Sequence, residues 1–143
     1  MTSSVFPDVN VWLALSTPDH QHFTLAWSWY MALPEECVPA FCRFTQLGFL
    51  RLLTTQSVMG KGTLTQAQAW DAYDRWIEAA GAKFEDEPGG LEPVFRALSG
   101  KQEVSPKEWA DAYLVAFAEA GNLTLVTMDR ALAAKAKGAV LLS

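Results

Sequence analysis

Three aspartates stand at positions where helices and strands do not normally carry charge. Asp8 ends the first apolar run, Val5–Asp8, and Asp129 follows the apolar run Leu123–Thr127. Asp111 lies in the second turn of a predicted helix, beside small and apolar side chains. In open α/β sheets, ligands bind beyond the carboxyl ends of the strands, so these carboxylates are expected to converge on one point.

Carboxylates that converge repel one another, and a divalent cation removes that repulsion. Mg²⁺ and Mn²⁺ fit best, because both prefer oxygen ligands. Such an ion can activate water and stabilise charge on a phosphodiester. The sequence therefore predicts a metal-dependent hydrolytic site.

Each aspartate also has an ordinary structural interpretation. Asp8 can be the N-cap of a helix over Val9–Leu15, and Asp129 the N-cap of the last helix. Asp111 can be an exposed helix residue. Their joint placement, with two of them at matching strand ends, favours a site over these separate roles.

Short apolar runs alternate with longer helical patterns, which indicates an α/β fold with a mostly parallel sheet. The predicted strands are Val5–Asp8, Cys37–Pro39, Lys83–Glu85, Leu123–Thr127 and Ala139–Leu142. The predicted helices are Val9–Leu15, Asp19–Leu33, Phe41–Leu53, one capped by Thr65 and stopped at Gly81, Leu91–Leu98, Ser105–Ala120 and Asp129–Lys137. Thr54–Gly62 is predicted to be a polar loop. Ser105, Pro106 and Glu108 form the clearest predicted helix start.

Composition limits the class of protein. The 143 residues, half of them hydrophobic, suit a single domain over 1–143. The net charge of −5 argues against a protein that coats nucleic acid nonspecifically. Two cysteines make no disulfide framework, the start MTSSVF is not a signal peptide, and no membrane span is expected. A cytoplasmic protein is predicted.

Several segments resemble the PIN-domain family: VFPDVNVWLAL, WADAYLVAFA and LVTMDRAL. The segment FCRFTQLGFLRLLT also resembles VapC-type toxins, the PIN-domain ribonucleases of bacterial toxin–antitoxin pairs. The resemblance runs from Val5 to about Leu142. It implies a three-layer α/β/α sandwich around a mostly parallel sheet of about five strands. It also implies Mg²⁺- or Mn²⁺-dependent cleavage of RNA by a metal-activated water, a cognate antitoxin protein as partner, and a homodimer.

The resemblance assigns roles to individual residues. Asp8, Asp111 and Asp129 match the catalytic, metal-binding acids, and Asn10 and Thr127 match their polar neighbours. PIN domains usually carry a further acid in the helix that here spans Phe41–Leu53, but this stretch has none. Gln46 takes its place without negative charge, which puts metal affinity in question.

Basic and aromatic residues complete the expectations. Arg43 and Arg51 flank Gln46 and either bind RNA phosphate or are solvated helix charges. Lys107 and Arg130 either neutralise an acid or touch RNA. Of the six tryptophans, Trp12, Trp70 and Trp109 are expected in the core, and some of the others at an interface.

Two other functions remain open from the sequence. The absent acid favours a PIN-like protein-binding module with weak or no activity. A metal-dependent phosphatase or DNA nuclease on a similar frame is the other alternative.

Overall fold

One sheet organises the molecule, and a computed structural model describes it over residues 4–143. In that part of the chain the sheet has five strands in the order β3-β2-β1-β4-β5, and all the pairings are parallel. The strands are β1 (Ser4–Pro7), β2 (Val38–Phe41), β3 (Lys83–Phe84), β4 (Thr124–Thr127) and β5 (Val140–Leu141). Residues 1–3 lie outside the described residues, and with them the first part of the predicted domain 1–143 and of the start MTSSVF.

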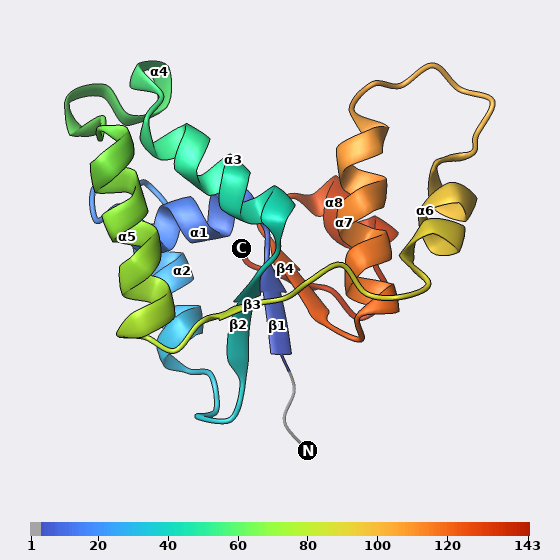
Figure 1. The fold of residues 1–143 in the computed structure, drawn as a ribbon, viewed down its shortest axis with the longest axis horizontal. Helices are drawn as coiled ribbons and strands as arrows, with labels where there is room; N and C mark the ends of the chain where they lie inside the picture. The colour runs from blue at the N-terminus through green and yellow to red at the C-terminus, as the bar shows by residue number, and fades with distance from the viewer. Residues whose placement is uncertain (1–3) are drawn as a thin grey trace.

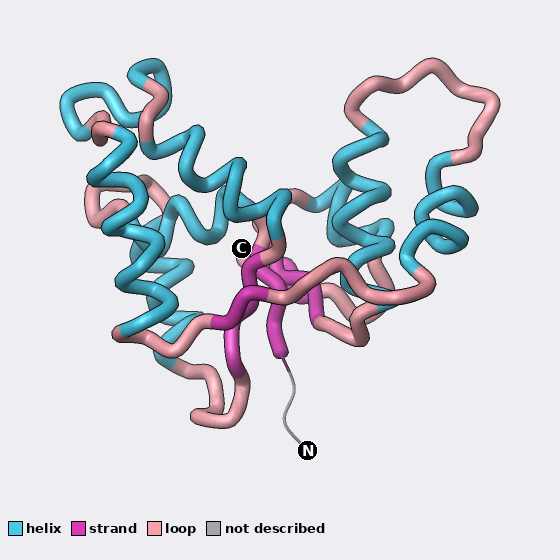
Figure 2. Tube along the Cα trace, in the orientation of Figure 1, coloured by secondary structure: helices cyan, strands magenta, loops and turns pink. Residues whose placement is uncertain are grey.

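Side chains alternate between the two faces of the sheet, as the pleat of a strand requires. Val5 and Val126 belong to one buried cluster, whereas their neighbours Phe6 and Leu125 belong to another. Helices cover both faces, so the molecule has three layers (Figures 1 and 2). The predicted α/β/α sandwich with a parallel sheet is confirmed.

The helices divide between these two faces. The Val5 cluster includes side chains of α1 (Val9–Ser16), α2 (Phe23–Met31), α3 (Arg43–Leu53) and α5 (Gln66–Glu78). The Phe6 cluster includes side chains of α6 (Leu91–Ser99), α7 (Glu108–Ala120) and α8 (Arg130–Lys135). The short α4 (Gln56–Met59) and the 3₁₀ turn η1 (Gly60–Gly62) connect α3 to α5.

Strand order reverses beside the central strand. From β1 the chain moves outward to β2 and β3, and then returns to the other side of β1 for β4 and β5. The carboxyl ends of β1 and β4 are therefore neighbours, with Pro7 opposite Val126. Ligands bind at such switch points in open parallel sheets. Asp8 and Asp129 follow these two strands.

Two helices begin later than the sequence suggests. Asp19 does not cap α2, because the chain makes successive turns here: the amide of His20 donates to Thr17 O at 2.9 Å and that of Phe23 to His20 O at 3.0 Å. Ser105 does not cap α7. The Glu108 amide donates to Ser105 O at 3.2 Å, which closes a separate turn, and Lys107 is the N-cap.

The segment Thr54–Gly62 is not the loop that its polar composition indicates. It folds into α4 and η1, and the hydroxyl of Thr55 donates to Arg51 O at 2.6 Å. By contrast, the predicted capping box at the start of α5 is confirmed: Gln68 N donates to Thr65 Oγ1 at 3.1 Å and Thr65 N to Gln68 Oε1 at 2.9 Å.

Aromatic side chains fill the core on the α1 side. Trp12 stacks on Phe41 with ring centroids 3.8 Å apart, and Trp76 meets it edge-on. The expectation that Trp70 and Trp109 are also buried is wrong, since they are 47% and 59% exposed. Both extend from helix faces that no other element covers fully. None of the helices in residues 4–143 has the length and apolar composition to cross a membrane.

Candidate active site

Asp8 is a buried carboxylate between β1 and α1. Its Oδ1 accepts from the Val11 amide at 3.1 Å, which caps α1, and its Oδ2 accepts from the Thr127 hydroxyl at 2.5 Å. Only 6% of the residue is exposed. Burial raises the pKa of Asp8, and the charge of Asp129 raises it further, while the hydrogen bonds from Thr127 and Val11 oppose this shift. A buried carboxyl group is therefore held next to a second one.

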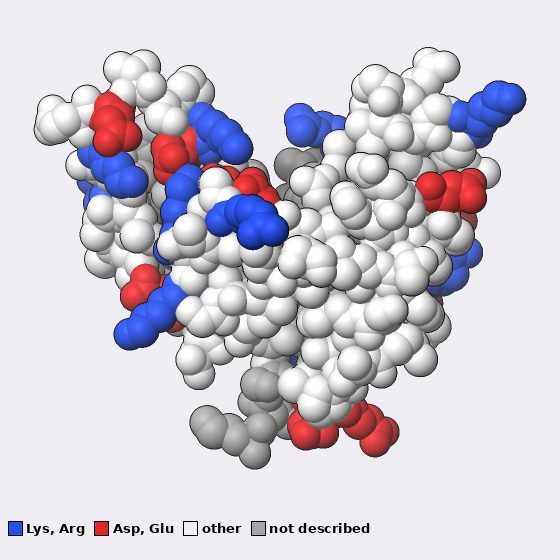
Figure 3. Space-filling view, turned by 180° about the vertical axis from the view of Figure 1, so that it is seen from behind, with Lys and Arg blue, Asp and Glu red and all other residues white. Residues whose placement is uncertain are grey.

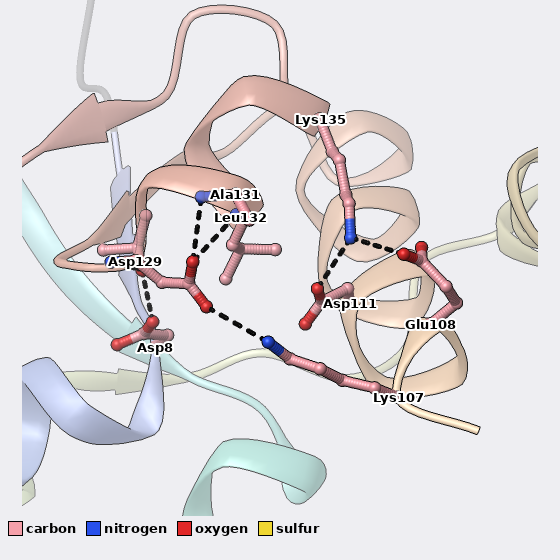
Figure 4. A network of polar contacts seen from close by, with 9 residues as sticks. Asp8, Lys107, Glu108, Asp111, Asp129, Ala131, Leu132 and Lys135 are labelled. Carbon is pink, nitrogen blue, oxygen red and sulfur yellow. Dashed lines mark hydrogen bonds and ion pairs between the residues drawn. The ribbon is translucent and has the colours of Figure 1, made fainter. Parts of the chain in front are cut away.

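Asp129 follows β4 and caps α8. Its Oδ1 accepts from the amides of Ala131 and Leu132 at 2.9 and 3.2 Å, and its own amide donates to Thr127 Oγ1 at 3.0 Å. Its Oδ2 lies 4.0 Å from Lys107 Nζ (Figure 4). Both capping interpretations from the sequence hold, and the caps bring the two carboxylates together.

The hydroxyl of Thr127 links the two strand ends. It donates to Asp8 and accepts from the Asp129 backbone, and the residue is fully buried. The threonine hydroxyl therefore fixes the carboxylate of Asp8 and the backbone of Asp129, whose own carboxylate is held by the amides of α8.

Asp111 lies on α7 and has a different partner. Its Oδ2 accepts from Lys135 Nζ at 2.9 Å, and the same ammonium donates to Glu108 Oε1 at 2.9 Å (Figure 4). Among residues 4–143, no three acidic, histidine or cysteine side chains gather closely enough to hold a metal ion. The structure thus brings Asp8 and Asp129 together, with Asp111 turned toward Lys135.

Sequence reasoning missed Glu108 and Lys135 as members of this network. The hydrogen bond from Lys135 lowers the pKa of Glu108, and the two carboxylates raise the pKa of Lys135. Glu108 had a signal, since it precedes Asp111 by three residues and shares its helix face. Lys135 had none, because its contact with Asp111 spans 24 residues of sequence.

Gln46 and Arg43 belong to a network around the start of α3. Arg43 donates to Gln46 Oε1 at 2.6 Å and lies over the ring of Phe84, 4.6 Å from its centroid. The Gln46 side chain also lies beside the Tyr73 hydroxyl, where it opposes the rise in the pKa of Tyr73 that burial causes. These contacts join α3 to β3 and α5. Within the described residues, the hydrogen bonds of Gln46 do not reach Asp8.

Asn10 and Arg51 line a groove of about 1060 Å³ on the α1 side. Its walls also carry exposed apolar side chains, with Phe44 40%, Leu47 63% and Trp70 47% exposed. Asn10 points from the first turn of α1 into solvent, two residues after Asp8. The space-filling view shows a notch between the two helical lobes, with basic side chains on both of them (Figure 3).

A family model described as the PIN domain matches residues 5–138. Ribonuclease VapC41 of Mycobacterium tuberculosis is 43% identical over 132 residues, which cover 87% of this chain and 88% of the relative.

Solved structures share the fold at lower identity. VapC20 of M. tuberculosis, described as a toxin that cleaves the sarcin–ricin loop, has a TM-score of 0.62 and 17% identity over 91% of this chain and 93% of its own. VapBC2 of Rickettsia felis, solved on a DNA fragment from its promoter, has a TM-score of 0.66 and 13% identity over 96% of each chain. These two similarities concern the fold alone.

Proposed function

The chain belongs to the PIN-domain family, and from this membership we propose that it is a VapC-type ribonuclease, the toxin of a toxin–antitoxin pair. The observation that carries the proposal is the pair Asp8 and Asp129, joined through Thr127 at the switch point of the sheet. Similarity to the ribonuclease VapC41 over most of both chains supports the same activity.

The donor set at this point fits a hard divalent cation, Mg²⁺ or Mn²⁺. Asp8 is buried with a raised pKa beside a second carboxylate, and a cation relieves that arrangement. When bound, the ion supplies a water of lowered pKa and positive charge at the phosphodiester. Asp8 and Asp129 are its proposed ligands, Thr127 orients them, and Asp111 joins them when it leaves Lys135.

Basic side chains beside the acids are the proposed contacts for the RNA backbone. Lys107 is three-quarters exposed and only 4.0 Å from Asp129, so phosphate can compete for it. Arg51 is exposed on the groove wall near Asn10, which fits the same role. Arg43 keeps part of its guanidinium on Gln46, so it offers fewer free donors.

Protein partners are the second part of the proposal. A cognate antitoxin and a second copy of the chain are expected from the toxin assignment. The exposed apolar residues Phe44, Leu47 and Trp70 support a protein contact on this side of the molecule, because aromatic side chains are enriched at interfaces.

Two observations favour an inactive, protein-binding PIN domain instead. Asp111 is occupied by Lys135, and Gln46 stands where the family usually has an acid. In that case the protein binds its partner without cleaving RNA. A DNA nuclease or a phosphatase differs from the ribonuclease and from the inactive module in the substrate that it cleaves.

Cleavage of a labelled RNA, and of DNA of the same sequence, tests the proposal. We expect RNA cleavage with Mg²⁺ or Mn²⁺, none in EDTA, and a large loss in Asp8→Asn, which keeps the cap but removes the charge. Asp71→Asn, an exposed aspartate on α5, is the matched control and should cleave like wild type. On expression, wild type and Asp71→Asn should arrest growth equally, and Asp8→Asn should arrest it much less.

Equal cleavage by wild type and Asp8→Asn would refute the site. Cleavage of DNA alone would refute the substrate class. A folded protein that binds Mn²⁺ without cleaving RNA would favour the inactive module.

A further inference from the structure

The ammonium of Lys135 forms ion pairs with two carboxylates of α7, those of Glu108 and Asp111. Its ammonium lies 2.9 Å from Asp111 Oδ2 and 2.9 Å from Glu108 Oε1, and its side chain is about one-third exposed at 32%. Asp111 is the more buried acid, with 10% of its side chain exposed, whereas that of Glu108 is 32% exposed. One lysine is therefore shared between an inner and an outer carboxylate.

This lysine is carried by the same short helix that Asp129 caps. Asp129 is the N-cap of α8, and Lys135 is its last residue. The helix therefore connects the strand-end acids to the acids of α7 (Figure 4). Lys107, the other cation here, approaches Asp129 only to 4.0 Å and is 75% exposed. Lys135 makes the closer ion pairs of the two.

We propose that Lys135 is a built-in counter-ion that holds Asp111 in the metal-free protein, and that Glu108 retains Lys135 when Asp111 moves to a bound divalent cation. The inference rests on the proposed function. Because the ammonium already contacts both acids, release of Asp111 leaves its charge paired with Glu108. Lys135 and Glu108 are thus positioning residues that set metal affinity with opposite signs.

Manganese titration calorimetry of the whole chain tests this, with no dependence on activity. Lys135→Met keeps the aliphatic stem and removes the competing charge, so Mn²⁺ should bind about threefold tighter or more. Glu108→Gln leaves Lys135 to Asp111 alone, so Mn²⁺ should bind more weakly by a similar factor. Lys137→Met removes the same charge from an exposed position nearby and should leave the affinity close to wild type.

The double variant Glu108→Gln with Lys135→Met distinguishes retention from ligation. If Glu108 acts only through Lys135, its substitution has no effect on Mn²⁺ affinity once the lysine is absent. If Glu108→Gln weakens Mn²⁺ binding equally in wild type and in Lys135→Met, Glu108 is itself a ligand and the proposed role is wrong.

Folding is checked in parallel by circular dichroism, and Lys135→Arg, which keeps the charge, covers the case in which the methionine variant does not fold. The arginine variant should keep wild-type affinity. If the folded methionine variant melts lower but binds Mn²⁺ like wild type, Lys135 contributes only to stability. The inference about Lys135 is then wrong, whereas the proposed function is unaffected. If wild type binds no Mn²⁺, or Asp8→Asn binds it equally well, the proposed metal site fails and the inference falls with it.

Discussion

Thr127→Val is the sharpest test of how the strand ends are held. Valine has nearly the same shape as threonine, so the fully buried position stays filled. The hydroxyl is lost, and with it the donor to Asp8 Oδ2 at 2.5 Å and the acceptor of the Asp129 amide at 3.0 Å. Asp8 remains buried, with the Val11 amide as its remaining hydrogen-bond donor among the contacts described above.

The expected loss of stability follows from these two contacts. A hydrogen bond to a charged acceptor contributes about 1.5–3 kcal/mol and a neutral one about 0.5–1.5 kcal/mol, so we expect a loss of roughly 2–4 kcal/mol. For a domain of this length that corresponds to a melting temperature roughly 6–12 °C lower. The Thr127 hydrogen bond also opposes the raised pKa of Asp8, so its removal should raise that pKa further.

Urea unfolding at neutral pH measures the difference directly. Thr124→Val makes the same chemical change at the opposite end of β4, away from the carboxylates, and should shift stability by less than about 0.5 kcal/mol. If Thr127→Val unfolds like Thr124→Val, the hydroxyl does not hold the two acids, and the account of the site given above is refuted.

Three further substitutions have defined outcomes. Burial raises the pKa of Asp8 above its ordinary value of 3.8, so this carboxyl group stabilises the fold below that value and loses the contribution as pH rises through its native pKa. Asp8→Asn should therefore be more stable than wild type at neutral pH but not in acid, as urea titrations at the two pH values would show. Gln46→Glu should pair with Arg43, 2.6 Å from the present amide oxygen, and leave Mn²⁺ affinity unchanged in calorimetry; tighter binding would place Gln46 at the metal. Trp76→Phe loses the 2.8 Å hydrogen bond to Ser16 and should cost about 1 kcal/mol in urea unfolding, whereas an unchanged midpoint would mean that the bond contributes nothing.

The strand-end acids could be predicted from the sequence because their position depends on local pattern and on a general rule of parallel sheets. Asp8 and Asp129 each follow a short apolar run, and such runs end at one edge of the sheet. Their capping roles were also visible, since Asp is a preferred N-cap residue. The resemblance also placed Thr127 beside these acids, but its hydrogen bond to Asp8, 119 positions away, is a tertiary contact that no local pattern contains.

The α7 side of the site depended on contacts that no local pattern contains. Asp111 was placed on the correct helix, but its partner Lys135 comes from a different element. The same holds for Trp70 and Trp109, whose apolar neighbours in sequence suggested burial, while their exposure depends on which elements pack beside α5 and α7. Gln46 was placed by resemblance; its hydrogen bond from Arg43 is local to α3, whereas its position beside Tyr73 of α5 is set by tertiary packing.

The hydrogen bond between Thr127 and Asp8 joins residues 119 positions apart, which bears on when, during synthesis, the two strand-end acids can meet. Chains fold from the N-terminus during synthesis, and the central strand β1 is made first. In the described part of the chain, its neighbour β4, with Thr127 and Asp129, follows only after the α-helices α1 to α7 have been translated. A growing chain therefore lacks the paired acids until β4 and Asp129 have left the ribosome, so under the proposed function the chain cannot cleave RNA before that point.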